Sequence, residues 1–158
     1  MARTGIRAAA TGAVATMAIS GAVLTGLNGA HATDSRQIAG TWQVTVQPDG
    51  APSTAAFEST LVYTATGSVI ETTSKAPASA GLGAWERLGS GRYAMTFQKY
   101  RFNGPTYVGK TVIEEVQYVS PDGSQYTGRA TTTVYDAAGN VVATISATAT
   151  GSRMAASS

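Results

Sequence analysis

Two adjacent glutamates, Glu114 and Glu115, are the residues in this chain that best suit acid–base chemistry. They lie in an otherwise mostly apolar run from Val112 to Tyr118, which has the residue types of a β-strand. Alternate side chains of a strand share a face, and this places Glu114 on the more apolar face of the run. We therefore predict that Glu114 points into the protein, where burial would raise its pKa and suit it to general acid or base catalysis.

The same glutamate also has a purely structural interpretation. It would then pair with an inward-facing cation such as Lys99 or Arg101, or accept hydrogen bonds from tyrosine hydroxyl groups. The chain has seven tyrosines, whose hydroxyl groups could equally orient a bound ligand. The residues alone leave the catalytic and the structural roles open.

The N-terminal segment has the pattern of a secretory signal peptide. Arg3 and Arg7 form a basic start, an apolar stretch follows to about Leu27, and Ala30-His31-Ala32 matches a small-x-small cleavage site. The stretch is interrupted by glycines and is too weakly hydrophobic for a transmembrane span of about 20 apolar residues. We predict a signal peptide over residues 1–32, a secreted protein, and one domain over residues 33–158 with no integral membrane segment.

The composition of residues 33–158 excludes several classes of function. Of the 11 lysines and arginines, Arg3 and Arg7 lie in the signal peptide, and the remaining nine balance nine acidic residues. This balance does not favour nucleic acid or an anionic membrane surface as a partner. The only histidine leaves with the signal and there is no cysteine, so the usual nucleophilic triads, zinc sites and haem ligation are excluded. We expect no metal and no cofactor.

Turn residues divide the domain into eight strand-like runs. All five prolines fall in the short gaps between these runs, and short gaps join antiparallel neighbours because parallel strands need long crossovers. We predict an all-β fold, a single eight-stranded antiparallel up-and-down β-barrel. The strands are expected at about residues 39–47, 54–65, 68–74, 83–88, 91–102, 106–119, 124–135 and 140–150.

Strand phase places aromatic side chains on one wall of the predicted lumen and small ones on the other. The inward positions of the last two strands are mostly Ala, Gly, Thr and Val, which leaves room for one small ligand. A bulge near Gln98 and Lys99 would turn Tyr100 inward with the aromatic residues that precede it. The predicted ligand-facing residues are Phe57, Tyr63, Tyr93, Phe97, Tyr100, Tyr118 and Tyr126. The competing interpretation is that Phe57, Tyr93, Phe97 and Tyr100 fill the lumen themselves.

Gly40-Thr41-Trp42 opens the first strand, and Arg153 follows the last. With eight meandering strands between them, the domain resembles the lipocalin-like, or calycin, superfamily of secreted β-barrels. The resemblance implies that Trp42 packs beneath Arg153 and closes the base of the barrel. Such a cation–π contact stabilises a fold by roughly 0.5 to 2 kcal/mol.

Three functions are compatible with these features. The first is a secreted barrel that binds a small, largely hydrophobic molecule in its lumen. The alternative is a cofactor-free barrel enzyme, a cyclase or isomerase of a hydrophobic metabolite, in which Glu114 and a tyrosine are catalytic. A third is an extracellular module that binds another protein through the barrel rim or the loop over residues 75–83. Whether the protein is an enzyme is left open by the sequence.

Overall fold

The computed structural model describes residues 36–75 and 78–155, so the predicted signal peptide lies outside the described residues. The described chain is almost entirely β-structure, with one short 3-10 helix, η1, at Ser53–Ala55. None of its helices is long and apolar enough to cross a membrane. The strands are β1 Gly40–Pro48, β2 Phe57–Tyr63, β3 Ser68–Thr73, β4 Gly81–Gly89, β5 Arg92–Asn103, β6 Thr106–Val119, β7 Gln125–Asp136 and β8 Val141–Arg153.

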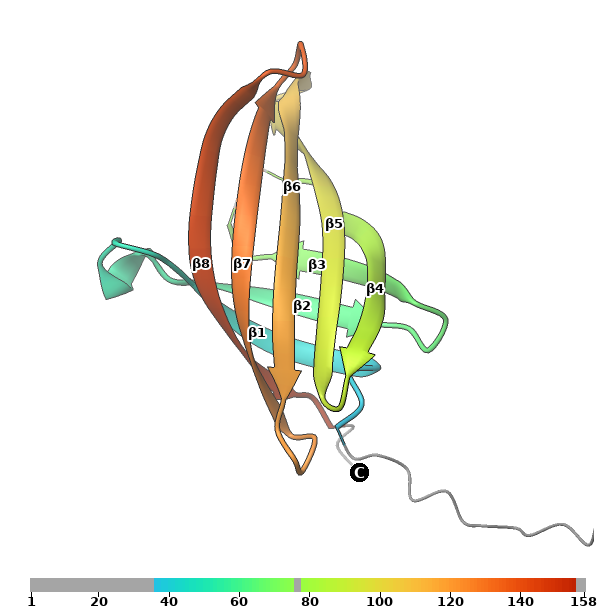
Figure 1. Ribbon diagram of the computed structural model, residues 1–158. Coiled ribbons are helices and arrows are strands. Elements are labelled where there is room, and N and C mark those ends of the chain that lie inside the picture. Colours follow the sequence, from blue (N-terminus) through green and yellow to red (C-terminus); the bar gives the residue numbers. More distant parts are fainter. Residues whose placement is uncertain (1–35, 76–77, 156–158) are drawn as a thin grey trace, which may run out of the picture. The chain divides into compact units, whose positions relative to one another are not determined.

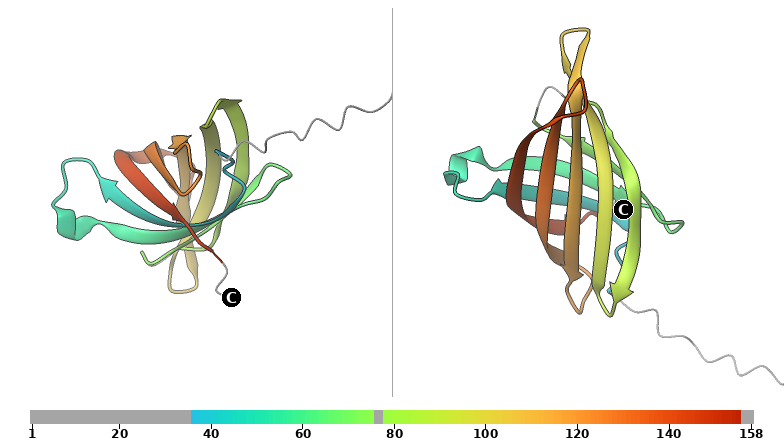
Figure 2. Two further views of the ribbon diagram at one scale, coloured as in Figure 1. Left: turned by 90° about the horizontal axis from the view of Figure 1, so that it is seen from below. Right: turned by 45° about the horizontal axis from the view of Figure 1, so that its top comes forward.

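The predicted eight-stranded antiparallel up-and-down barrel is confirmed. Each strand pairs with the next along the chain, and β8 returns to pair with β1, which closes the sheet. In Figure 1, β5 to β8 run side by side, and β1 to β3 cross behind them. Figure 2 shows the same two groups of strands facing each other. The closed sheet therefore has two unlike walls, one of long strands and one of shorter strands.

The packed core fills the end of the barrel where β1 begins and β8 ends. Trp42 is fully buried there, and its ring lies edge-on to that of Tyr126 with 5.1 Å between the ring centroids. Trp85 packs edge-on against both Tyr63 and Tyr93. Edge-to-face aromatic pairs add to the free energy of burial. This end of the barrel is therefore solid. Here aromatic side chains fill the interior themselves, as the competing interpretation predicted for Tyr93.

The predicted bulge near Gln98 and Lys99 is wrong, because the pairing of β5 with β6 is regular through this region. The register shifts only between Arg101 and Phe102. Regular alternation keeps Lys99 on the inner face and turns Tyr100 outward. The Tyr100 side chain is 46% exposed and lies against Tyr107 on the outer surface.

The base of the barrel is closed by Arg153, whose guanidinium carbon lies 4.3 Å from the ring centroid of Trp42. Its Nε donates to the carbonyl of Gly123 at 2.7 Å, its Nη1 to the carbonyl of Ala39 at 2.7 Å, and its Nη2 to the carbonyl of Gln37. Gly40 leaves room for this group, since a Cβ there would lie 2.5 Å from Nη1, and its φ of 133° disfavours other residues. The structure thus brings together the two residues that the sequence paired.

Replacing Arg153 with methionine tests this closure. The variant keeps most of the apolar stem but leaves three carbonyl groups without their charged donor and removes the cation over Trp42. We expect the free energy of unfolding in urea to fall by about 2 kcal/mol or more. Arg129→Met is the matched control, because Arg129 pairs with Asp49 on the exposed surface, and it should have a far smaller effect. Equal losses in the two variants would contradict a closing role for Arg153.

Candidate functional site

The half of the barrel away from Trp42 and Arg153 holds an open pocket of about 750 Å³. Its wall is largely apolar and includes Val46, Phe57, Ile113, Val134, Ala143 and Ile145. This volume lies within the range of about 300 to 1,000 Å³ that is typical of small-molecule sites. The small side chains of β7 and β8 were predicted to leave such room, and here they line the pocket.

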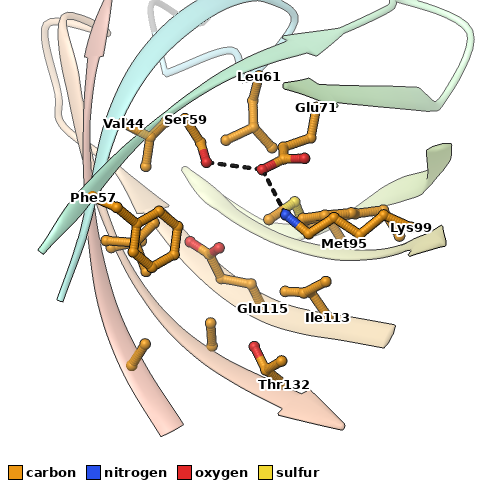
Figure 3. A pocket seen from close by; sticks show the side chains of 15 residues that line it. Val44, Phe57, Ser59, Leu61, Glu71, Met95, Lys99, Ile113, Glu115 and Thr132 are labelled. Atoms are coloured by element: carbon orange, nitrogen blue, oxygen red, sulfur yellow. Dashed lines mark hydrogen bonds and ion pairs between the residues drawn. The ribbon is translucent and has the colours of Figure 1, made fainter. Parts of the chain in front are cut away.

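A smaller inner chamber of about 60 Å³ lies next to this outer pocket and shares part of its lining. Figure 3 shows the side chains around it, among them the two carboxylates Glu71 and Glu115. Met95 and Leu61 contribute apolar surface to the same chamber. A chamber of this size, with two carboxyl groups in a mostly apolar wall, suits ordered water or a small polar group of a ligand.

Glu71 on β3 is a buried carboxylate that the sequence analysis did not single out. It is 2% exposed, and its Oε1 accepts hydrogen bonds from the Ser59 hydroxyl group at 2.8 Å and from Lys99 Nζ at 3.1 Å. Its Oε2 has no hydrogen-bond partner among the described residues. Alternation along β3 places Glu71 on the same face as the buried Val69, and that signal could have identified it.

Glu115 on β6 is the second buried carboxylate, with an exposed fraction of 5%. Burial raises its pKa to about 7, and the hydrogen bond that Gln117 Nε2 donates to Oε1 at 3.2 Å only partly opposes the rise. Gly128 on β7 makes room for the side chain, because a Cβ there would overlap the Glu115 carboxylate. A carboxyl group with this pKa exchanges protons readily near neutral pH.

The prediction that Glu114 points inward is wrong, since Glu114 is exposed on the outer face and Glu115 takes the inner position. The outer face of this strand carries Val112 and Tyr118 and is therefore the more apolar one in composition. The inner face carries polar side chains that bond to one another, Glu115 and Gln117. Apolar composition thus did not identify the buried face. No observation tests Glu114 as a catalytic residue, but its position leaves it outside the lumen.

Hydrogen bonds connect Glu115 through Gln117 to Tyr63. Gln117 Nε2 donates to the Tyr63 hydroxyl oxygen at 2.5 Å, and the Tyr63 hydroxyl group donates to Met95 Sδ at 3.1 Å. Burial raises the pKa of Tyr63 far above its usual range, so the hydroxyl group keeps its proton. Glu115, Gln117 and Tyr63 thus form one connected network, and the sequence analysis did not find Gln117.

The predicted ligand-facing aromatic residues separate into three groups in the structure. Phe57 and Phe97 line the inner chamber. Tyr63, Tyr93 and Tyr126 point inward but pack in the closed end of the barrel. Tyr100 and Tyr118 point outward, with exposed fractions of 46% and 55%, so their prediction as lumen residues is wrong. Tyr118 shares the outer face of β6 with Glu114, and the same phase error misplaced both.

The described residues contain no cluster of three or more His, Cys, Asp or Glu side chains that could hold a metal ion. No protein-family model, curated protein or solved structure matches this chain. The assignment of a function therefore rests on the lumen and its side chains.

The pH dependence of stability tests the state of Glu115. The folded protein holds the Glu115 proton between pH 4.5 and about 7, where the unfolded chain has already released it. Ionisation of Glu115 in the unfolded chain therefore lowers the free energy of unfolding as pH rises through this window, by up to about 3 kcal/mol. We expect Glu115→Gln to remove this loss, so that the variant matches the parent near pH 4 and exceeds it at pH 8 in urea unfolding.

Glu114→Gln is the matched control for this experiment. The Glu114 side chain is exposed on the outer face, and the stability of this variant should follow that of the parent across the whole pH range. A Glu115→Gln protein whose pH profile parallels that of the parent would show that the Glu115 carboxyl group is not held protonated by burial.

Proposed function

We propose that this protein is a secreted, calycin-like barrel that binds a small, largely hydrophobic molecule in its lumen. The observation that carries the proposal is the open pocket of about 750 Å³ with its largely apolar wall. The secretory pattern of residues 1–32 supports export. The meandering eight-stranded order and the Trp42–Arg153 closure support the calycin-like assignment.

The two ends of the barrel differ in a way that suits a container. The closed end is filled by Trp42, Tyr63 and Tyr126, whereas the open half is lined by small side chains such as Ala143 and Ala147. An apolar molecule that enters the open half would remove hydrophobic surface from water on both partners, at roughly 25 cal/mol for each Å² buried. The base is packed by the protein's own side chains, so little ordering cost is expected there on binding.

Binding of the neutral, environment-sensitive dye Nile red tests this proposal. We expect saturable fluorescence enhancement by the parent protein and at least tenfold weaker binding by Ala143→Phe, because the new ring would occupy the pocket. Thr144→Phe is the matched control, since Thr144 is the next residue of β8 and is exposed on the outer face. It should bind the dye like the parent.

Two outcomes would contradict lumen binding. One is the absence of saturable dye binding to a folded parent protein. The other is an equal loss of binding in the Ala143→Phe and Thr144→Phe variants, which would place the dye on the outer surface. Circular dichroism of each variant separates these outcomes from a loss of the fold.

A second candidate function, a cofactor-free cyclase or isomerase, is favoured by Glu115. This carboxyl group borders the inner chamber beside the larger pocket, and its pKa of about 7 lets it accept or donate a proton near neutral pH. Gln117 links it to the Tyr63 hydroxyl group, which accepts a hydrogen bond from Gln117 Nε2 and donates one to Met95 Sδ. Cyclisation and isomerisation rearrange bonds and protons within one molecule, so they require no external atom donor. Glu115 replaces Glu114 as the candidate catalytic residue.

Incubation with a mixture of apolar metabolites tests this second candidate. The parent protein should convert at least one compound into a product of the same mass and a different chromatographic retention time. Glu115→Gln should abolish that conversion while Nile red binding stays within about twofold, and Glu114→Gln should retain both activities. Conversion that persists in Glu115→Gln would remove this carboxyl group from catalysis.

A further inference from the structure

The charged side chains that line the outer pocket are all positive. Lys75, Lys99 and Arg101 contribute to its wall, and none of the described Asp or Glu residues does. Lys99 is neutralised by Glu71 at 3.1 Å. Among the described residues, neither Lys75 nor Arg101 has an acidic partner within salt-bridge distance. The mouth of the lumen therefore carries two positive charges that no acidic side chain of residues 36–75 and 78–155 pairs with.

The fold brings these two cations to one place. Regular pairing of β5 as far as Arg101 keeps Arg101 on the same face as Lys99, two residues earlier. Ala78 forms an isolated bridge with Arg101, which holds the connection between β3 and β4 against the end of β5. Lys75 belongs to this connection, and its Nζ lies 4.9 Å from the ring centroid of Phe57 in the pocket wall. This cation–π contact orients Lys75 toward the pocket.

The inner end of the lumen has the opposite character. The inner chamber contains two carboxyl groups, Glu71 and Glu115, and one cation, Lys99, that is already paired. A negative group placed there would lose its water and meet two acidic side chains, which costs free energy. At the mouth, the same group would stay partly hydrated and would face Lys75 and Arg101.

From this distribution of charge we infer that the ligand is an amphipathic anion, with its acidic head between Lys75 and Arg101 and its apolar body in the outer pocket. This inference rests on the proposed lumen binding and adds the chemical class and the orientation of the ligand. The apolar wall formed by Val134, Ala143 and Ile145 does not suit a free inorganic anion. A carboxylate, sulfate or phosphate head shares the required chemistry.

Three probes with one alkyl chain and different heads test the inference: decanoate, decanol and decylammonium. Isothermal titration calorimetry at neutral pH and low ionic strength should give the order decanoate, decanol, decylammonium from tightest to weakest. Each partly exposed ion pair is expected to strengthen binding roughly two- to fivefold. The double variant Lys75→Gln/Arg101→Gln should therefore bind decanoate roughly tenfold more weakly and bind decanol within about twofold of the parent.

The matched control is Arg92→Gln/Lys110→Gln, which removes the same amount of charge from the outer face of β5 and β6. It should change decanoate affinity by less than about twofold, and added salt should weaken decanoate binding by the parent but not by the mouth variant. Decanol binding with no preference for decanoate, or a preference for decylammonium, would overturn the inferred head group and leave lumen binding intact. Failure of the folded parent to bind any of the three probes would count against the proposed function itself.

Discussion

The structure depends on the pairing of β8 with β1, which joins the last strand of the sheet to the first. Trp42 lies opposite Arg153 in this pairing, and the guanidinium group of Arg153 bonds to three backbone carbonyls at the base of the barrel. With the sheet closed, every strand has one face inside a limited volume and one face outside. The inward side chains must therefore pack together in this volume, and a shift of a strand by one residue would move its inward side chains to the outer face.

Closure produces a barrel whose polarity alternates along its axis. The base is packed with aromatic side chains around Trp42, and above it lie the buried carboxyl groups of Glu71 and Glu115. An apolar pocket follows, and its wall includes Lys75 and Arg101, which have no acidic partner in the described part of the chain. Burial of carboxyl groups costs free energy that an all-apolar interior would avoid.

Lys99 lines both the inner chamber and the outer pocket. Its Nζ neutralises Glu71 at the chamber, while its side chain also lines the outer pocket. Glu115 has no such cation among its described hydrogen-bond partners, and burial raises its pKa to about 7. The two carboxyl groups thus differ in their partners, a cation for Glu71 and an amide for Glu115. The proposed binding and the proposed proton transfer therefore involve separate parts of one lumen.

The sequence alone was sufficient to predict the all-β fold, the eight strands, their antiparallel order and the two residues that meet at the base. The strands and their order follow from turn residues and strand composition, whereas the contact of Trp42 with Arg153 was implied by the resemblance to the calycin superfamily. The inner face of β1 was also predictable, because Trp42 and Val44 alternate with polar residues. The turn residues and the alternation in β1 are local signals. The contact of Trp42 with Arg153 concerns the first and last strands, which must meet in a closed sheet.

Three details of the site were decided only by the tertiary structure. The choice between Glu114 and Glu115 depends on the register of β6 with β7, where Gly128 makes room for the inner carboxylate. The outward position of Tyr100 depends on where β5 carries its register shift. The pairing of Glu71 with Lys99 joins residues that are 28 positions apart. Period two permits either phase of a strand, and only contact with neighbouring strands selects the one that the interior can hold.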